Sequence, residues 1–376
     1  MSGPGVGFEY PRQEVSWLKR DVLLFANTIG CTADELHFLF VALPFILPEC
    51  HHLTLKQELH PDFAVFPSYP VILPFKRTTQ EVIDFYAAQA ETPIPGVPKF
   101  DSTRVLDGQR RLIFHKPLPT TSEGRKFEIR QKILGVYDKG KSGSVVENQT
   151  DIVDKETDEV YSSAIGSAFF VGQGNWGGPK GPASVNFPPP QGKKPDATVS
   201  HQTTAESALL YRLNGDYNPL HATPEPGKKM GFGGAIMHGL SSFNFAAHGL
   251  LKAIGGSDPK NIKEFQARFA SPVKPGDKLV TEIWRTGEVT DGWEDVRFIT
   301  KVEGGKVCLS NGRALIKPVE GRMEVVKNEG VNFRDVSRGV SVSVIIVEEL
   351  RGQGATGPFD RKARIKMVKR PKRIAI

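Results

Sequence analysis

The chain has 376 residues, of which 39% are hydrophobic, so it is long enough to form two or three domains with sizeable cores. Its 49 basic and 42 acidic side chains give a net charge of +7, and the segment 360–376 holds eight of those basic groups and one of the acids. Residues 1–359 therefore carry equal numbers of basic and acidic side chains, so the excess positive charge lies in the tail. A basic tail can contact nucleic acid or a membrane surface, but we expect a solvated extension and no nucleic-acid partner.

The sequence also argues against membrane and secretory functions. It contains no apolar run of about 18 residues or more, and its N-terminus lacks a basic segment followed by an apolar one. Its three cysteines, Cys31, Cys50 and Cys308, leave one unpaired in any disulfide scheme. We therefore expect no transmembrane segment, and a reducing compartment.

The first half of the chain shows helical spacing before strand spacing. Apolar residues predict a helix over 12–29, ending before Gly30, and a second helix over 76–88. From Arg104 the hydrophobic period shortens towards two, which predicts strands at 111–115, 127–137, 144–146 and 160–171. The Gly- and Pro-rich stretch 172–196 is typical of a linker.

The second half repeats this plan. Helices are predicted over 207–213 and 240–254, the latter closed by Gly255 and Gly256. Alternating patterns then predict strands at 265–269, 278–284, 293–302 and 306–310. Periodicity alone therefore indicates an α+β protein with two similar domains.

A motif follows the helix predicted over 207–213. In it, Asp216, Asn218 and His221 lie around Gly215 and Pro219. Two titratable groups on a segment that turns twice can converge on a single water, as general acid–base chemistry requires. The alternative is an ordinary turn, because Asp and Asn beside Gly and Pro are common turn formers, with His221 as a structural histidine.

A second signal lies downstream, where an apolar run ends at His238 and Gly239 and a helical pattern begins. A Gly at a helix N-terminus leaves backbone N–H groups free to face a developing oxyanion. The sequence therefore indicates a base, an acid and an oxyanion donor within one short window.

The motifs at 214–221, 237–240 and 267–277 resemble, in order and spacing, those of the hydratase 2 branch of the MaoC-like dehydratases. This branch includes the (3R)-specific hydratase domain of peroxisomal multifunctional enzyme type 2. Weaker resemblance at 66–70, 106–110, 116–119 and 137–140 extends it over roughly residues 1–320. The resemblance implies an α+β double hotdog, in which each of two curved antiparallel sheets wraps around a long helix.

This resemblance also implies a domain plan. Residues 1–171 would form a catalytically silent hotdog, since they contain no equivalent of the motif, and would shape a tunnel for medium and long acyl chains. Residues 172–196 would be the linker and 197–320 the catalytic hotdog. The segment 321–376 would be an atypical extension, in which 341–347 is a β-prone association hazard.

The implied reaction is reversible hydration of a (2E)-enoyl-CoA to a (3R)-3-hydroxyacyl-CoA in fatty-acid β-oxidation. By resemblance, His221 would be the general base, Asp216 would relay a proton to Cα, and Asn218 would orient the pair or the water. The N–H of Gly239 would bind the thioester oxygen. Substrate-binding positions implied in the same way are Asp107, Gly108, Lys139, Tyr217, Pro219, Leu220, His238, Arg268 and Phe269.

Several of these positions have alternative interpretations. Lys139 and Arg268 would face CoA phosphates and Phe269 its apolar part, but a solvated Lys and a strand-packed Phe are alternatives. His238 would be a fixed structural partner before the helix or a direct participant. The family commonly has His-Gly-Glu where this chain has Asp107, Gly108 and Gln109, a departure that would alter contacts with CoA.

The resemblance implies a homodimer, and the reaction implies neither a metal nor a redox cofactor. His51, His52 and His60 match no zinc-ligand spacing. Peroxisomal residence is implied, although the chain ends without a Ser-Lys-Leu-like tripeptide, and cytoplasmic residence is the alternative. Two further functions stay open: a dehydratase acting on a branched or polyketide-like thioester in a specialised pathway, and a non-catalytic acyl-CoA-binding protein.

Overall fold

The computed structural model describes residues 3–40, 62–78, 81–87 and 92–319. These residues belong to one compact unit, Met1–Gly330, and none belongs to the second unit, Val331–Ile376. The histidine cluster at 51–60, the expected strand at 341–347 and the basic tail therefore lie outside the described residues.

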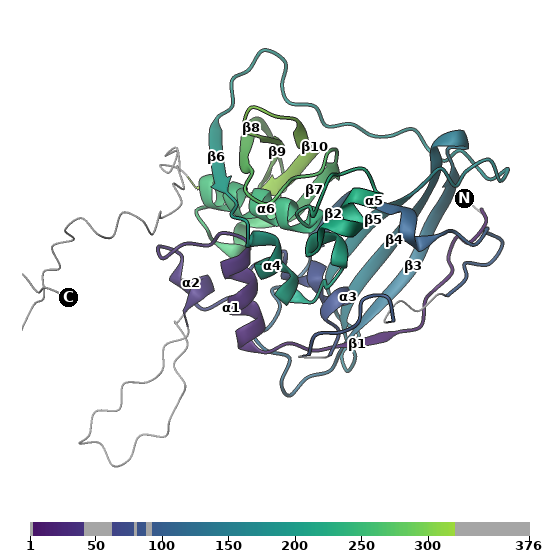
Figure 1. The fold of residues 1–376 in the computed structure, drawn as a ribbon. Helices are drawn as coiled ribbons and strands as arrows, with labels where there is room; N and C mark the ends of the chain where they lie inside the picture. Colours follow the sequence, from purple (N-terminus) through teal and green to yellow (C-terminus); the bar gives the residue numbers. More distant parts are fainter. Residues whose placement is uncertain (1–2, 41–61, 79–80, 88–91, 320–376) are drawn as a thin grey trace, which may run out of the picture. The chain divides into compact units, whose positions relative to one another are not determined.

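Ten strands of the described residues form one antiparallel sheet in the order β1-β3-β4-β5-β2-β7-β10-β9-β8-β6 (Figure 1). The first half contributes five of them: β1 (Gln13–Val15), β2 (Val105–Phe114), β3 (Phe127–Asp138), β4 (Gly143–Asp154) and β5 (Val160–Val171). The second half contributes the others: β6 (Ala197–Gln202), β7 (Ile262–Phe269), β8 (Lys278–Thr290), β9 (Trp293–Val302) and β10 (Val307–Ile316).

The two halves of the sheet meet where β2 pairs with β7. Gln109 lies opposite Arg268 at one end of this pairing, and Ile113 lies opposite Glu264 at the other. Each strand would otherwise be an edge with unpaired backbone groups, so the pairing closes both edges and makes the sheet continuous.

All eight predicted strands overlap observed ones, whereas β1 and β6 are not predicted from the sequence. Both of these strands lie at the outer ends of the sheet. β1 has three residues and β6 is largely polar, so neither shows the alternation of a half-buried strand.

Helix α6 (Gly239–Gly255) is the long helix of the second half, and the second-half strands pack against it (Figure 1). All of its 17 residues except Gly239 and Lys252 are buried. A helix that is buried on every face is mostly apolar, and its buried polar side chains need partners. Here Ser241, Asn244 and His248 bond to the carbonyl of His238, to the Tyr211 hydroxyl and to Glu35. It ends where Gly256 adopts a left-handed φ of 66°, at the position that the sequence predicts.

The helices described in the first half are short: α1 (Lys19–Thr28), α2 (Leu36–Leu39) and α3 (Leu73–Lys76). The helix predicted over 12–29 is therefore shorter than expected, because residues 13–15 pair with β3 instead. Aromatic packing covers this part of the sheet, with the Trp17 ring centroid 4.7 Å from that of Phe127. The arrangement is the expected α+β double hotdog, but among the described residues the long helix belongs to the second half.

The prediction of a helix over 76–88 is wrong. Helix α3 ends at Lys76, Arg77 takes a positive φ of 58°, and residues 81–87 form bends and turns. Val82 and Tyr86 are 65% and 57% exposed. Their helical spacing therefore has no core to pack against, and packing is what stabilises most short helices.

The remaining elements connect these parts. They are α4 (Ser207–Tyr211), α5 (Pro224–Lys229) and the 3-10 turns η1 (Tyr69–Ile72), η2 (Ser102–Arg104), η3 (Gly140–Ser142), η4 (Arg212–Asn214), η5 (Pro219–His221) and η6 (Pro259–Asn261). None of the helices in the described ranges has the length and apolar character needed to cross a bilayer.

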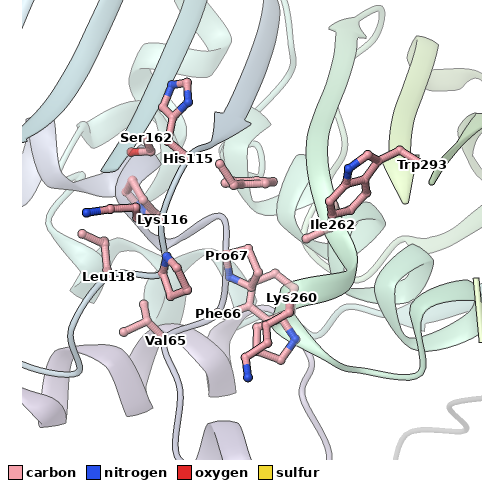
Figure 2. Close-up of a pocket in the computed structure, with 14 residues that line it drawn as sticks. Val65, Phe66, Pro67, His115, Lys116, Leu118, Ser162, Lys260, Ile262 and Trp293 are labelled. Carbon is pink, nitrogen blue, oxygen red and sulfur yellow. The ribbon is translucent and has the colours of Figure 1, made fainter. Parts of the chain in front are cut away.

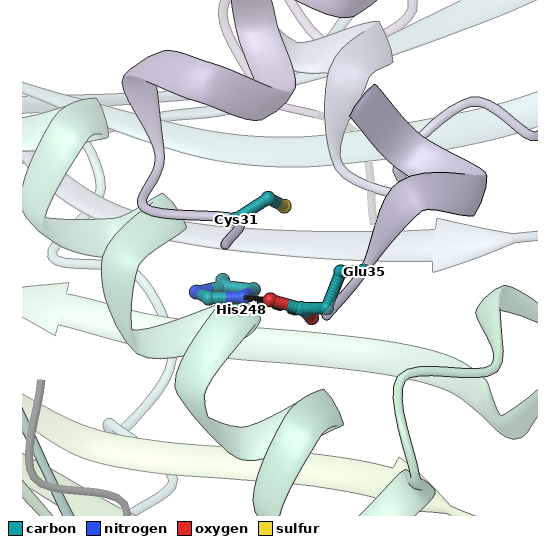
Figure 3. A group of neighbouring side chains, drawn as sticks. All are labelled: Cys31, Glu35 and His248. Atoms are coloured by element: carbon teal, nitrogen blue, oxygen red, sulfur yellow. Dashed lines mark hydrogen bonds and ion pairs between the residues drawn. The ribbon is translucent and has the colours of Figure 1, made fainter. Parts of the chain in front are cut away.

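A buried polar cluster ties the loop after α1 to α6 (Figure 3). The Glu35 carboxylate accepts hydrogen bonds from His248 Nε2 at 2.9 Å, Ser257 Oγ at 2.7 Å and Lys252 Nζ at 3.1 Å. Burial alone would raise the pKa of Glu35. The hydrogen bond and charge of His248, together with hydrogen bonds from Ser257 and the backbone N–H of Thr32, outweigh burial and hold that pKa well below its usual range. Cys31 lies beside this pair, and burial raises the pKa of its thiol.

The side chains of Cys31, Glu35 and His248 could in principle hold a metal ion, since their ligand atoms lie within 4.8 Å of one another. The Glu35 oxygens, however, already accept from an imidazole, a hydroxyl and an ammonium group. The burial of Cys31 also favours its neutral thiol over the thiolate that binds metals. The cluster therefore acts as a structural anchor between the two halves.

We predict that Glu35→Gln lowers the free energy of unfolding by about 3–5 kcal/mol, because it removes one partner of a buried ion pair. The pKa of Glu35 is lowered by folding, so its stabilisation is complete above the unfolded pKa of about 4.3 and is lost as the pH falls below it. Urea unfolding at neutral and acidic pH measures both effects. The control is Glu14→Gln, which breaks the exposed pair with Lys155 and should change stability little. Equal effects of the two substitutions at neutral pH would contradict the prediction.

Candidate active site

The motif loop, residues 214–221, is held in place by the first half of the chain. Asn214 is buried, and its Nδ2 donates to Thr28 Oγ1 on α1 and to the carbonyl of Tyr211, both at 2.8 Å. Gly215 has a φ of 114°, and a Cβ there would lie 2.6 Å from the Cα of Lys76 on α3. Only glycine fits this position, because both the backbone conformation and the close approach exclude a side chain.

Asn218 shapes the turn that presents the two titratable groups. Its Oδ1 accepts from the N–H of Leu220 at 3.0 Å and so caps η5, while its own N–H donates to Asp216 Oδ1 at 3.2 Å. Asn218 therefore holds Asp216 through its backbone N–H. Tyr217, Pro219 and Leu220 lie on the same loop, and the buried Tyr217 ring is 5.3 Å from the guanidinium of Arg212.

The tautomer of His221 follows from its hydrogen bond. Its Nδ1 lies 2.9 Å from the carbonyl oxygen of Ile236. A carbonyl oxygen can only accept, so Nδ1 carries the proton and Nε2 of the neutral ring keeps a free lone pair. His238 is held in the same manner, because its Nε2 donates to the carbonyl of Asp216 at 3.1 Å. The two rings stack with centroids 3.8 Å apart.

Burial sets the charge state of this group. It lowers the pKa of His221 to about 4, and the nearby His238 adds to that shift. Burial lowers the pKa of His238 to about 4 as well. It raises the pKa of Asp216, and a positive charge on His221, when that ring is protonated, offsets part of the rise. At neutral pH both imidazoles are therefore uncharged, and His221 can accept a proton.

Asp216, His221 and His238 bring a carboxylate oxygen and two ring nitrogens within 4.8 Å of one another. This spacing suits a single bridging water, which can lie within hydrogen-bonding distance of both Asp216 and His221. A metal ion fits less well. The rings are stacked only 28° from parallel, so their in-plane lone pairs run side by side instead of converging on one ion.

Gly239 is the first residue of α6, and no side chain caps this helix end. The first N–H groups of a helix have no acceptor within the helix, so they are available to a ligand. A Cβ at Gly239 would lie 3.2 Å from the ring of Phe269, which places Phe269 beside this end of α6. The structure thus brings Gly239 and Phe269 together. The Phe269 ring also packs 6.1 Å from that of Phe243, in line with the strand-packed alternative.

The bulge at Gly108 brings Asp107 towards the same site. A Cβ at Gly108 would lie 2.7 Å from Ser167 Oγ, and the β2–β5 pairing shifts by one residue at this point. Asp107 forms an ion pair with Arg110 at 3.1 Å, and its charge helps to raise the pKa of Asp216, after the larger effect of burial. Arg110 lies in the stretch 106–110 that resembles the family, but the sequence analysis predicts no role for its side chain.

Arg268 and Lys139 lie in different surroundings. Arg268 on β7 donates to Asn186 Oδ1 at 3.3 Å and lies 3.5 Å from Gln109 Oε1. Lys139 lies in the β3–β4 turn, where its Nζ donates to the carbonyl of Lys180 at 2.5 Å. The contacts described for Lys139 join the first half to the linker and do not reach the motif loop.

Two family models match the chain: the MaoC like domain over residues 186–306 and the MFE-2 hydratase 2 N-terminal domain over residues 47–172. The probable dehydratase NIT22 of Ajellomyces capsulatus is 46% identical over 331 residues, which cover 85% of this chain and 83% of that protein. The peroxisomal enoyl-CoA hydratase 2 of Arabidopsis thaliana is 33% identical over 291 residues, covering 74% and 84% respectively.

Among solved structures, the MaoC-like dehydratase from Phytophthora capsici is similar, with 30% identity and a TM-score of 0.68. The match covers 83% of this chain and 97% of that one. The comparisons agree with the double hotdog fold. The chain therefore belongs to the MaoC-like dehydratase family, in the group that carries a hydratase 2 N-terminal domain, and it is a hydro-lyase.

Proposed function

We propose that this hydro-lyase reversibly hydrates (2E)-enoyl-CoA thioesters to (3R)-3-hydroxyacyl-CoA in fatty-acid β-oxidation. One observation carries the proposal above all others. His221 is neutral and the lone pair of its Nε2 is free. It lies close enough to the Asp216 side chain for one water molecule to hydrogen-bond to both. A base and an acid that share one water are what addition of water to a conjugated thioester requires.

In the proposed reaction, a water molecule lies between His221 and Asp216. Its oxygen forms a bond to Cβ of the substrate as His221 Nε2 takes one of its protons. The carbon–carbon double bond becomes single, and Cα receives a proton from Asp216, whose raised pKa favours the protonated form. Proton transfer from His221 back to Asp216 then restores both groups, and the reverse sequence removes water.

The negative charge that develops on the thioester oxygen needs a donor. We propose that the N–H of Gly239, at the positive end of the α6 dipole, supplies it. Phe269 would contact the apolar part of CoA beside this donor, and Arg268, Asp107 and Arg110 would set the polar contacts at the mouth. Hydration of an activated thioester requires neither a redox cofactor nor a metal.

A second candidate is dehydration, because the relative of 46% identity is named a probable dehydratase. Such a dehydratase could serve a specialised biosynthetic pathway. Dehydration uses the same acid and base as hydration and is the reverse reaction. We also propose peroxisomal residence, which a relative of 33% identity has by name. The expected homodimer stays a proposal as well; the exposed Leu209, Leu210 and Leu213 on α4 and η4 would suit a covered face.

We predict that Asp216→Asn and His221→Ala each lower kcat for (2E)-decenoyl-CoA by about 10²–10⁴-fold, the usual contribution of a positioned acid or base. The loss of ultraviolet absorbance of the conjugated thioester measures the rate, and chiral analysis identifies the product. Thr223→Ala, on the exposed end of the same turn, is the control. Formation of the (3S) product, or full activity of both variants, would contradict the proposal. Turnover confined to branched or polyketide-like thioesters would favour the second candidate.

We further predict a low acid limit for activity. The base must be neutral, and the pKa of His221 is lowered to about 4. On the acidic side, the value of kcat/KM should therefore fall only as the pH decreases through about 4. Circular dichroism at each pH separates this titration from unfolding. A limb near the ordinary histidine pKa of about 6.5 would show that His221 is not the buried base described here.

A further inference from the structure

The linker is attached to the second half of the sheet around residues 185–187, which we call the strap. The residue that attaches it is Asn311, a buried residue of β10. Its Oδ1 accepts from the backbone N–H of Phe187 at 2.5 Å, and its Nδ2 donates to the carbonyl of Val185 at 3.1 Å. One side chain thus holds the backbone of the strap at two points.

The ring of Phe187 provides a second attachment. The guanidinium groups of Arg297 on β9 and Arg313 on β10 lie 4.7 and 5.1 Å from its centroid, where cations interact favourably with an aromatic face. A Gly- and Pro-rich segment can connect two domains without any such contact. The contacts of the strap therefore call for an explanation beyond connection.

The backbone of Asn311 aims its side chain at the strap. Asn311 has a positive φ of 54°, a conformation that asparagine adopts more readily than most residues. It lies at a bulge, where β10 shifts register against β7 and against β9. Bulges redirect side chains out of the regular alternation of a strand. Here the redirected side chain reaches the strap.

Asn311 also reaches the junction of the two halves. Its Nδ2 lies 3.3 Å from Gln109 Oε1, and the same oxygen lies 3.5 Å from Nη2 of Arg268. Nη1 of Arg268 donates to Oδ1 of Asn186, in the middle of the strap, at 3.3 Å. The guanidinium of Arg268 therefore lies between two groups that Asn311 holds, the Gln109 side chain and the strap.

Arg268 is held without being neutralised. Glu264 lies on the same face of β7, but it pairs with Arg111 at 2.6 Å and with Arg313 at 2.8 Å. Within the described ranges, no carboxylate lies at ion-pair distance from Arg268. Its partners are two neutral amide oxygens at distances longer than those of good hydrogen bonds. Such a guanidinium can bind a phosphate more strongly than it binds these amides.

The position of Arg268 relates it to the candidate active site. Phe269 is the last residue of β7 and lies beside the Gly239 end of α6. Successive residues of a strand point to opposite faces, so Arg268 points away from α6 at the same end of the strand. A thioester bound at Gly239 would pass the end of β7 on its way to Arg268. In CoA, the group that lies beyond the pantetheine arm is a phosphorylated nucleotide.

We propose that Asn311 is a positioning residue for the binding of CoA. Through the strap and Gln109, it holds the guanidinium of Arg268 where this group can bind phosphates of the CoA nucleotide. The linker thereby sets the preference for CoA over thioesters that lack phosphate. This inference rests on the proposed function, because it concerns the thioester substrate of that reaction.

The test compares (2E)-decenoyl-CoA with (2E)-decenoyl-pantetheine, which has the same reacting atoms and no phosphate. The readout is the ratio of kcat/KM for the CoA thioester over that for the pantetheine thioester, with kcat and KM determined separately. Wild type is compared with Arg268→Gln, Asn311→Gly and the variant that combines them. Glycine adopts a positive φ freely, so Asn311→Gly removes the side-chain bonds without straining the bulge.

Two further variants separate the strap from general effects. Phe187→Leu removes the contacts with the two arginines and leaves Asn311 in place, so it tests the strap even if Asn311→Gly does not fold. Ser144→Ala is the control. It changes no charge and removes two hydrogen bonds that fix another part of the linker, those with the carbonyl of Gln173 and with Nε1 of Trp176.

We expect Arg268→Gln to lower the ratio about tenfold, because it removes charge-assisted hydrogen bonds to phosphate. Asn311→Gly and Phe187→Leu should each lower it about threefold or more, through a higher KM for the CoA thioester with kcat unchanged. The combined variant should be no worse than Arg268→Gln alone, because Asn311 acts through Arg268. Ser144→Ala should keep the wild-type ratio.

Several results would overturn the inference and leave the hydratase intact. One is an unchanged ratio in Arg268→Gln or in the strap variants. Another is an equal loss of activity towards both thioesters in Asn311→Gly and Phe187→Leu, which would show a purely structural role. A third is additive losses in the combined variant. If the wild-type protein turned over neither thioester, the proposed function would fail, and this inference with it.

Discussion

The pairing of β2 with β7 is the constraint on which the rest of the structure depends. It places Gln109 opposite Arg268, and therefore joins a strand of the half without the motif to a strand of the half that contains it. A hydrogen-bonded ladder has a defined spacing, so side chains at known positions on the two strands face known neighbours. The candidate active site lies at one end of this pairing, and a pocket lined by Phe114, Ile262 and Trp293 lies at the other (Figure 2).

The motif loop is a product of both halves for a second reason. Asn214 bonds to Thr28, and the backbone of Gly215 lies against the backbone of Lys76. The first half thus supplies the surface on which the loop turns, although it contributes neither Asp216 nor His221. Its contribution is positional, and burial by both halves keeps the imidazoles neutral.

Two clusters in this protein each place a histidine beside a carboxyl group, and they differ in what they can do. Glu35 receives hydrogen bonds from an imidazole, an ammonium group and a hydroxyl, so its lone pairs are occupied and its pKa is low. Asp216 accepts from one backbone N–H of Asn218, and burial raises its pKa. His248 points its Nε2 at Glu35, whereas His221 points its Nδ1 at a carbonyl and keeps Nε2 free. A satisfied pair stabilises the fold, and an unsatisfied pair can exchange protons with a substrate.

The sequence by itself determined the α+β class, eight of the ten strands, the end of α6 at Gly256 and the motif that contains Asp216 and His221. These features depend on local periods, on glycine's backbone freedom and on residue types at short spacing, all of which are written in neighbouring residues. The tautomer of His221, the involvement of Arg110, the absence of a helix over 81–87 and the remoteness of Lys139 were decided by the tertiary structure alone. Each depends on a partner distant in sequence, such as a carbonyl that fixes a ring, a strand that aims a side chain, or a core that a helix needs and does not find. Such partners are chosen by packing, which no local pattern encodes.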